Sequence, residues 1–504
     1  MPKLKINTNL YFLLIFTFLF INCSRKKSEL VWDKNLPVIG SQSSPRAVDL
    51  NGDGILDIVM GAGKNEFQHS DQGIIAIDGK TGELLWQQEA PDQVYGAATF
   101  SDINGDGIKD IFIGGRSPNL KALDGKTGVV LWEYKYAFED DPILKLARFN
   151  FYNIILIPDQ NNDGLPDLLT LNGGNAEADP YSDVNRFPGV LMVLDSKTGQ
   201  VLAADTMPDG KESYMSPLCF SQPNSQDFIV IFGTGGETID GNLYTVKLPD
   251  LMEKKLYKAE ILASDKGHGF IAPPVLADIN QDGYYDIVAI SHGSKIFAID
   301  GKDHQQIWQQ EIPDTESSNS FAVGYFTDDD TPDFFTFVSK GVWPENTGTL
   351  LVMIDGKNGR IAYKEPMGCT GFSSPVVYDL NRDGTDEVIV SINEFDCNRE
   401  ITDRSSFTVI NKLLAIDFKK KSVNTIDQTP GFKNIFSTPW IGDLDQDGYL
   451  DIVHCQYYNY SDLLSFLGMR VKRIDTPIRI KNPPVWGAYM GSNGDGIFPI
   501  AKIK

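Results

Sequence analysis

Short apolar runs alternate with turn-forming segments along nearly the whole chain. In the first such unit the apolar runs cover residues 46–50, 55–60, 73–77 and 84–87, and Asp- and Gly-rich stretches separate them. Short runs rich in Val, Ile and Leu that are bounded by Gly and Asp are typical of β-strands. No helical periodicity of useful length stands out. The pattern therefore predicts an all-β protein with four strands in its first unit.

An acidic nonapeptide recurs between the first and second strands of these units. Its pattern is acid, x, Asn/Asp, x, Asp, Gly, x, x, acid, and an apolar run follows at once. The intact copies cover residues 49–57, 102–110, 159–167, 278–286, 379–387 and 443–451. A damaged copy lies at 325–333, where Tyr325 and Thr327 replace the first two ligand positions, and another lies near 221–227. A period of about 50–60 residues indicates a repeat architecture.

A second repeat, Asp-Gly-Lys-Thr-Gly, joins the third and fourth strands, and a Trp often follows it. It covers 78–82 and 124–128, with variants at 195–199, 300–302 and 355–359. Gly accepts the left-handed backbone that such hairpin turns require. Four antiparallel strands repeated radially form the blade of a propeller. We therefore predict a single β-propeller of about eight four-stranded antiparallel blades over residues 30–504, with seven blades as the alternative.

The two ends of the predicted ring have distinct sequences. Residues 30–32 resemble a fourth strand without a blade of its own, which predicts a clasp that completes the last blade. Residues 483–496 fit neither repeat and are expected to cap the ring or to add a strand. A proline, which suits the first residue of a strand, recurs just before several first strands. These prolines are Pro45, Pro217, Pro274, Pro375 and Pro439.

Both repeats resemble known families. The nonapeptides resemble FG-GAP/VCBS repeats, the calcium-loop repeats of integrin α-chain propellers and of many bacterial surface proteins. The Asp-Gly-Lys-Thr-Gly units resemble the PQQ-like repeats of quinoprotein and outer-membrane assembly-factor propellers. The joint resemblance spans about residues 30–500. It implies a propeller fold and a calcium role, but it does not fix a function, because one fold serves many functions.

The intact nonapeptides are candidate calcium sites. Calcium takes six to eight oxygen ligands, and the loop brings positions 1, 3, 5 and 9 toward one point, with the backbone carbonyl of position 7 (Ile55 in the first copy) as a further donor. The alternative is that these are only Asp-Gly turns, which leaves the acid at position 9 unexplained. The predicted ligands of up to about six structural Ca²⁺ ions are Asp49, Asn51, Asp53, Asp57, Asp102, Asn104, Asp106, Asp110, Asp159, Asn161, Asp163, Asp167, Asp278, Asn280, Asp282, Asp286, Asp379, Asn381, Asp383, Glu387, Asp443, Asp445, Asp447 and Asp451.

The N-terminal segment has the pattern of an export signal. A basic start precedes an apolar run over residues 10–21, and Cys23 follows. The junction resembles the lipobox of bacterial lipoproteins, although Asn22 departs from its usual small residue. We predict a lipoprotein signal peptide at 1–22, lipidation at Cys23, a short tether at 23–29 and an exported protein that is lipid-anchored to the cell envelope, facing the periplasm or the cell surface. An ordinary secretory signal is the alternative.

The remaining cysteines show no Cys-x-x-Cys pair, so a zinc knuckle or thioredoxin-type site is not indicated. Cys369 and Cys397 flank the two inner strands of one predicted blade, and they are candidates for a disulfide in an oxidising compartment. Cys219 and Cys455 lie in apolar, strand-like contexts and are expected to be buried thiols.

Blade topology divides the loops between two faces. The nonapeptides and the Asp-Gly hairpins share one face, and the long, varied loops between second and third strands lie on the other. Because long loops on a rigid scaffold often carry binding sites, that second face is the predicted partner surface. The alternative for any single residue is packing on a neighbouring blade. The candidate contacts are Tyr181, Arg186, Trp343, Arg399, Tyr457, Tyr458 and Tyr460.

These features favour a non-catalytic, calcium-stabilised binding or adhesion propeller of the cell envelope, with protein or glycan partners. The net charge of −23 argues against nucleic acid. We predict no catalytic residue, because the sequence has no His-Glu-x-x-His, Gly-x-Ser-x-Gly or P-loop motif. His268 is expected to be structural. The alternative is a polysaccharide lyase-like or quinoprotein-like enzyme. The adjacent-cysteine pair of many quinoproteins is absent, which argues against PQQ.

Overall fold

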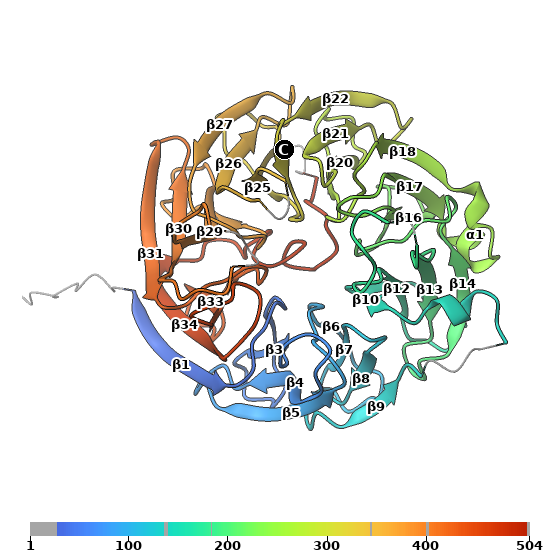
Figure 1. The fold of residues 1–504 in the computed structure, drawn as a ribbon, viewed down its shortest axis with the longest axis horizontal. Coiled ribbons are helices and arrows are strands. Elements are labelled where there is room, and N and C mark those ends of the chain that lie inside the picture. Colours follow the sequence, from blue (N-terminus) through green and yellow to red (C-terminus); the bar gives the residue numbers. More distant parts are fainter. Residues whose placement is uncertain (1–27, 136–139, 183, 343–344, 400–402, 501–504) are drawn as a thin grey trace, which may run out of the picture.

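Eight sheets stand radially around a central channel, as Figure 1 shows. The computed structural model describes residues 28–135, 140–182, 184–342, 345–399 and 403–500. Within these ranges, no helix is both long and apolar enough to cross a membrane. The predicted all-β propeller of eight four-stranded antiparallel blades is confirmed.

Most blades follow one another along the chain, with their strands in order from the channel outward. Blades 1 and 2 contain β2 (Arg46–Val48), β3 (Asp57–Gly61), β4 (Ser70–Ile77) and β5 (Leu84–Ala90), then β6 (Thr99–Ser101), β7 (Asp110–Gly114), β8 (Leu120–Leu123) and β9 (Val130–Glu133). Blades 3 and 4 contain β10 (Asn150–Phe151), β11 (Ile155–Ile157), β12 (Asp167–Gly173), β13 (Val190–Leu194) and β14 (Val201–Thr206), then β15 (Leu218–Ser221), β16 (Phe228–Gly233), β17 (Gly241–Lys247) and β18 (Glu260–Asp265).

The second half of the ring repeats this arrangement. Blades 5 and 6 contain β19 (Val275–Ala277), β20 (Asp286–Ile290), β21 (Lys295–Ile299) and β22 (Gln306–Glu311), then β23 (Thr315–Glu316), β24 (Ala322–Gly324), β25 (Asp333–Lys340), β26 (Thr349–Ile354) and β27 (Ile361–Pro366). Blade 7 contains β28 (Val376–Tyr378), β29 (Glu387–Glu394), β30 (Ile410–Asp417) and β31 (Ser422–Pro430). The short helices are η1 (Leu144–Leu146), α1 (Leu248–Met252) and η2 (Leu256–Lys258), all in connections between strands.

The two ends of the chain close the ring in blade 8. Its inner strands are β32 (Trp440–Gly442), β33 (Tyr449–Tyr458) and β34 (Gly468–Arg479). The outer strand is β1 (Glu29–Pro37), which pairs antiparallel with β34 from Glu29–Asp475 to Pro37–Gly468. The predicted clasp is therefore confirmed. Blade 8 differs from the others because its third strand, β34, and its fourth strand, β1, come from opposite ends of the chain, so no hairpin joins them.

Tryptophans on the outer strands of four blades form hydrogen bonds to the neighbouring blade. Each indole N–H donates to the backbone carbonyl of the following blade's Asp-Gly hairpin. The pairs are Trp32 to Gly79 (2.7 Å), Trp86 to Gly125 (2.8 Å), Trp132 to Ser196 (2.7 Å) and Trp308 to Gly356 (2.8 Å). The last Gly of the hairpin packs directly on the indole of this Trp. A side chain would not fit there, since a Cβ on Gly128 would come within 2.6 Å of the Trp86 indole. This contact explains why Trp and the second Gly recur together.

Hydroxyl groups beside the first strands form a second link between blades. Each accepts a backbone N–H from the blade before it. The contacts join Thr438 N to Ser44 Oγ (3.0 Å), Ser374 N to Thr438 Oγ1 (3.0 Å) and Ser320 N to Ser374 Oγ (3.2 Å). The hydroxyl residues that precede Pro45, Pro375 and Pro439 thus connect neighbouring blades around the channel.

The C-terminal segment crosses the channel, as the red chain at the centre of Figure 1 shows. Its carbonyls accept backbone N–H groups from first strands of different blades, including Trp486 from Val377 (2.9 Å), Gly487 from Ile441 (2.7 Å) and Gly496 from Leu276 (2.8 Å). The predicted cap is confirmed, and no strand forms in this segment. We call residues 483–498 the plug.

The cysteines are placed as predicted. Cys369 and Cys397 form a disulfide that joins the approach to β28 with the loop after β29. Cys219 and Cys455 are buried thiols. The signal peptide and Cys23 lie outside the described residues, and so does Trp343.

Candidate functional site

Each acidic loop curls around its own first carboxylate. In blade 1, Asp49 accepts the backbone N–H groups of Gly52 (2.7 Å) and Gly54 (3.0 Å), and Asn51 Oδ1 accepts that of Asp53 (2.9 Å). The loops of blades 2, 3 and 5 repeat these contacts with small changes. The side chains at positions 1, 3 and 5 therefore lie on one concave side of the loop, and they supply carboxylate and amide oxygens, which suit a hard cation.

The acid at position 9 has a structural task that the sequence interpretation missed. Asp57 is buried, and its two oxygens accept the N–H groups of Leu50 (2.9 Å) in its own loop and Gly79 (3.0 Å) in the Asp-Gly hairpin. The same bridge to the hairpin glycine occurs at Asp110, Asp286 and Asp333. The repeated acid is therefore explained without a metal, and it joins the two sequence repeats into one unit.

Burial raises the pKa of these bridging acids, because ionisation in a desolvated site is unfavourable. The pKa of Asp57, Asp286 and Asp333 rises to about 6, and burial also raises that of Glu387, the position-9 acid of blade 7, which makes no hairpin bridge in the described contacts, to about 8. In blade 3 the bridge is incomplete. Asp167 Oδ1 is buried and accepts no hydrogen bond there, and the hairpin has Ser196 in place of the first glycine.

The Asn at position 3 adds the hairpin aspartate to the cluster. Asn104 Nδ2 donates to Asp124 Oδ2 (3.0 Å), and the same contact joins Asn280 to Asp300 (2.9 Å) and Asn381 to Asp417 (3.0 Å). Each of these sites thus holds one more carboxylate than the nonapeptide alone supplies.

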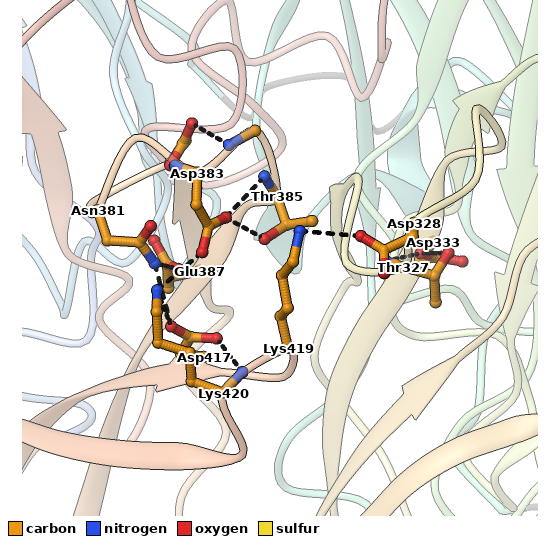
Figure 2. Close-up of polar contacts among 12 residues, drawn as sticks. Thr327, Asp328, Asp333, Asn381, Asp383, Thr385, Glu387, Asp417, Lys419 and Lys420 are labelled. Atoms are coloured by element: carbon orange, nitrogen blue, oxygen red, sulfur yellow. Dashed lines mark hydrogen bonds and ion pairs between the residues drawn. The ribbon is translucent and has the colours of Figure 1, made fainter.

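Blade 7 brings three carboxylates together around a lysine, as Figure 2 shows. Oxygens of Asp383, Glu387 and Asp417 lie within 4.8 Å of one another. Lys420 Nζ lies 2.7 Å from Asp383 and 3.1 Å from Asp417, and its hydrogen bond lowers the pKa of Asp383. The adjacent Lys419 points the other way, to Asp328 (2.9 Å) in the damaged loop of blade 6.

Blade 8 contains an arginine in the corresponding place. Asp443, Asp445 and Asp451 lie within 4.8 Å of one another. The buried guanidinium of Arg473, on β34, pairs with Asp445 (2.5 Å) and Asp451 (2.9 Å) and donates to the carbonyl of Gly79 in blade 1 (3.1 Å). In the described part of the chain, no Lys or Arg pairs with the predicted ligand carboxylates of blades 1, 2, 3 and 5.

A cavity of about 500 Å³ lies at the mouth of the channel. One residue from each blade lines it, three positions before the recurrent proline or its equivalent, so the cavity opens on the face opposite the acidic loops. These residues, the funnel rim, are Gln42, Tyr95, Tyr152, Tyr214, Ile271, Ser318, Phe372 and Phe436. Tyr489 of the plug also lines the cavity. The volume suits a small ligand or one anchoring side chain.

Two arginines lie beside the tyrosines of the funnel. Arg116 pairs with Glu66, and its guanidinium lies 5.4 Å from the centre of the Tyr95 ring. Its Nε and Nη1 are buried without a hydrogen-bond partner. Arg186 pairs with Glu212 and donates to the Tyr214 hydroxyl (3.2 Å). Burial raises the pKa of Tyr95 to about 12. These rings stay neutral hydrogen-bonding groups at physiological pH.

The predicted partner residues fall into three groups. Arg186 lines the funnel, and Tyr181 is exposed on the same loop. Tyr458 and Tyr460 lie near each other with ring centres 5.7 Å apart, and Tyr460 is exposed. Tyr457 is fully buried, because its ring packs on Phe466 and its hydroxyl donates to Leu463 O (2.6 Å). It supports its loop and offers no surface to a partner.

Arg399 also serves its own loop. Its guanidinium lies 4.3 Å from the centre of the Phe407 ring and pairs with Asp403 (2.9 Å), and its side chain is buried. The funnel-rim aromatics were missed from the sequence. The signal was present, since an aromatic residue stands three positions before Pro217, Pro375 and Pro439.

Comparisons with known proteins agree with this architecture. Residues 25–143 match the family model described as outer membrane protein assembly factor BamB, so the PQQ-like repeat is present in the first two blades. No curated protein matches the chain. Among solved structures, a europium-containing methanol dehydrogenase is 11% identical, with 89% of this chain and 93% of that chain covered and a TM-score of 0.57.

Two further structures cover a similar share of this chain. A quinohemoprotein alcohol dehydrogenase from Pseudomonas putida is 10% identical, with 90% of this chain and 77% of that chain covered and a TM-score of 0.55. BamB from Moraxella catarrhalis is 12% identical, with 91% and 99% covered and a TM-score of 0.48. At identities this low, the likeness to the two dehydrogenases shows a shared fold and no more.

Proposed function

We propose that this protein is a non-catalytic binding propeller of the cell envelope that holds a protein or glycan partner at the funnel, with calcium in its acidic loops. The observation that carries the proposal is the funnel itself. Five of its eight rim residues are aromatic, and two arginines adjoin them. Aromatic side chains and arginines dominate the energetics of recognition sites because they combine a large apolar surface with directed hydrogen bonds.

The envelope location is supported by two observations. The N-terminal pattern predicts export and lipidation at Cys23, and the matched family model describes an outer membrane assembly factor. The FG-GAP/VCBS resemblance and the oxygen-rich loops support calcium. Where no lysine or arginine balances the clustered carboxylates, an external cation would relieve their repulsion.

A quinoprotein-like enzyme is the second candidate, because the fold extends over most of a methanol dehydrogenase. The funnel fits PQQ poorly. PQQ carries three carboxylates, whereas Arg116 and Arg186 are already paired with Glu66 and Glu212. Little positive charge is left for the cofactor, and we derive no redox step.

The test is capture of envelope proteins and glycans by the wild-type protein and by a Tyr95→Ala/Tyr214→Ala variant. Tyr257→Ala is the control, because Tyr257 is exposed on η2 and does not line the funnel. The proposal expects a partner that the wild type and the control retain and the funnel variant loses. Equal capture by all three proteins would place the partner elsewhere, and dye reduction that requires added PQQ would favour the enzyme.

A further inference from the structure

Two histidines and a glutamate meet between blades 4, 5 and 6, on the funnel face and outside every acidic loop. His268 lies in the connection from β18 to β19, His292 in the tight turn between β20 and β21, and Glu316 at the end of β23. A ring nitrogen of each histidine and a carboxylate oxygen of Glu316 lie within 4.8 Å of one another. His292 and Glu316 are buried, whereas His268 is partly exposed.

Hydrogen bonds fix which nitrogen of each ring is free. His268 Nδ1 lies 2.8 Å from the carbonyl oxygen of Glu237, and His292 Nδ1 lies 3.1 Å from that of Ser317. A carbonyl oxygen only accepts, so both Nδ1 atoms carry the hydrogen and Nε2 is left as the coordinating atom. Metal-bound histidines commonly show this arrangement, in which the second ring nitrogen donates to a backbone carbonyl.

His292 Nε2 is the observation that points to a ligand. It is buried without a hydrogen-bond partner, and it faces Glu316 Oε2 at 3.6 Å. That separation is long for a hydrogen bond. It is close to the roughly 3.3 Å expected between two ligands that hold one tetrahedral ion at about 2.0–2.1 Å.

The backbone also makes room for the cluster. A Cβ on Gly293 would come within 2.7 Å of the His268 ring. Only glycine at this turn lets the ring lie against it. The partly exposed edge of His268 gives the site an entry path from solvent, and Ser318 of the funnel rim lies 3.3 Å from His292 Nδ1 on the other side.

We propose that His268, His292 and Glu316 bind a zinc-class divalent ion. Two imidazoles and one carboxylate are the donor set that suits Zn²⁺ and its neighbours in the first transition series rather than Ca²⁺. Three protein ligands leave a fourth position for water or for a group of a molecule in the funnel. This site does not depend on calcium in the acidic loops or on the identity of the funnel partner.

The test is a Zn²⁺ titration of the untagged chain in excess Ca²⁺, so that oxygen-rich loops do not compete for zinc. We expect one Zn²⁺ per chain, a loss of affinity of at least about tenfold in His268→Gln and in Glu316→Gln, and no loss in His69→Gln. The last is the matched control, because His69 belongs to an exposed group with Asp71 and Glu89.

A second readout separates coordination from general destabilisation. Co²⁺ bound by imidazole nitrogen absorbs visible light, so wild type and His69→Gln should show a spectrum that His268→Gln lacks. His268 is only partly buried, and this variant should fold even if Glu316→Gln does not. Zinc binding that survives both substitutions, or no binding in excess Ca²⁺, would overturn the assignment and leave an imidazole–carboxylate ion pair.

Discussion

The acidic loops of blades 1 and 2 share a sequence motif with those of blades 7 and 8, but they differ in counter-charge. In the first pair, the carboxylates accept backbone N–H groups and Asn side-chain amides, and no Lys or Arg pairs with them among the described residues. In the second pair, Lys420 and Arg473 enter the cluster. A repeated motif therefore does not imply a repeated occupant, and calcium should matter most where the protein supplies no cation of its own.

The position of blade 8 in the ring accounts for its arginine. Blades 1, 2, 5 and 7 place a hairpin aspartate beside the Asn at position 3, whereas blade 8 has no hairpin between its outer strands and has Asp445 at position 3. An Asp cannot donate as Asn does. Arg473 supplies the donors instead, and by contacting Gly79 it also fastens blade 8 to blade 1.

The largest effect is expected for Arg473→Gln. It would leave Asp445 and Asp451 near each other without their cation, and removing one partner of a buried pair costs about 3–5 kcal/mol. Chemical denaturation in chelator measures the loss. Calcium should restore more stability to this variant than to wild type, because the eighth loop would then resemble the first.

Arg360→Gln is the control for this experiment, since Arg360 is exposed and lies 3.9 Å from Asp355. Its effect should stay within about 0.5 kcal/mol. Equal midpoints for Arg473→Gln and wild type would show that the guanidinium is not the counter-charge of blade 8.

Two substitutions in blade 1 separate the backbone bridge from the metal. Asp57→Asn places an N–H donor against the N–H of Leu50 or Gly79, so it should cost about 1–3 kcal/mol even in chelator. Asp53→Asn lies on the exposed side of the loop and should be nearly neutral in chelator. It should reduce the stabilisation by calcium, which reaches about 2.7 kcal/mol per site at a hundredfold excess over Kd. If both variants lost the same free energy of unfolding in chelator and in calcium, the bridge and the metal site could not be separate functions of the loop.

Local sequence patterns predicted the blades well but the sites only in part. The nonapeptide and the hairpin each specify a turn, and their spacing places the strands, so the eight blades and the clasp at 30–32 could be anticipated. The bridge from Asp57 to Gly79 could not be, because it depends on how two turns 22 residues apart meet in space. Arg473 was hidden for the same reason, since it lies in the interior of a strand and belongs to no motif.

The funnel and the histidine cluster show the same limit. Funnel-rim residues come one from each blade, and His268, His292 and Glu316 come from two separate connections and from the short strand β23. No linear spacing brings such residues together. The burial of Tyr457 on β33 likewise depends on Phe466, in the connection from β33 to β34, whose ring packs on the Tyr457 ring.

The damaged loop of blade 6 offers a test of the bridge by pH. Burial raises the pKa of Asp333 to about 6, against about 3.9 in an unfolded chain. Between these values the native state binds more protons than the unfolded state, so this group makes the protein less stable as pH rises from about 4 to about 6.

Asp333→Asn should remove this contribution, so that the stability difference between wild type and variant changes by up to about 1.4 kcal/mol per pH unit inside the window. Tyr325 and Thr327 occupy two of the ligand positions here, so we expect calcium to affect this comparison little. A constant difference from pH 4 to pH 6 would mean that Asp333 titrates alike in both states.

The smallest effect is expected for Lys420→Met in blade 7. The Lys420 side chain is 53% exposed, and exposed ion pairs contribute only about 0–1 kcal/mol. Its stability loss in chelator should therefore be slight and should shrink further in high salt. The informative quantity is the stabilisation by calcium, which should exceed that of wild type, because an ammonium group and a metal ion compete for the oxygens of Asp383 and Asp417.

Lys419→Met is the matched control, since it removes an adjacent charge that faces Asp328 in blade 6. If Lys420→Met and Lys419→Met gain equally from calcium, only net charge matters. If Lys420→Met alone gains, the lysine occupies the place that we propose for a calcium ion in blades 1 and 2.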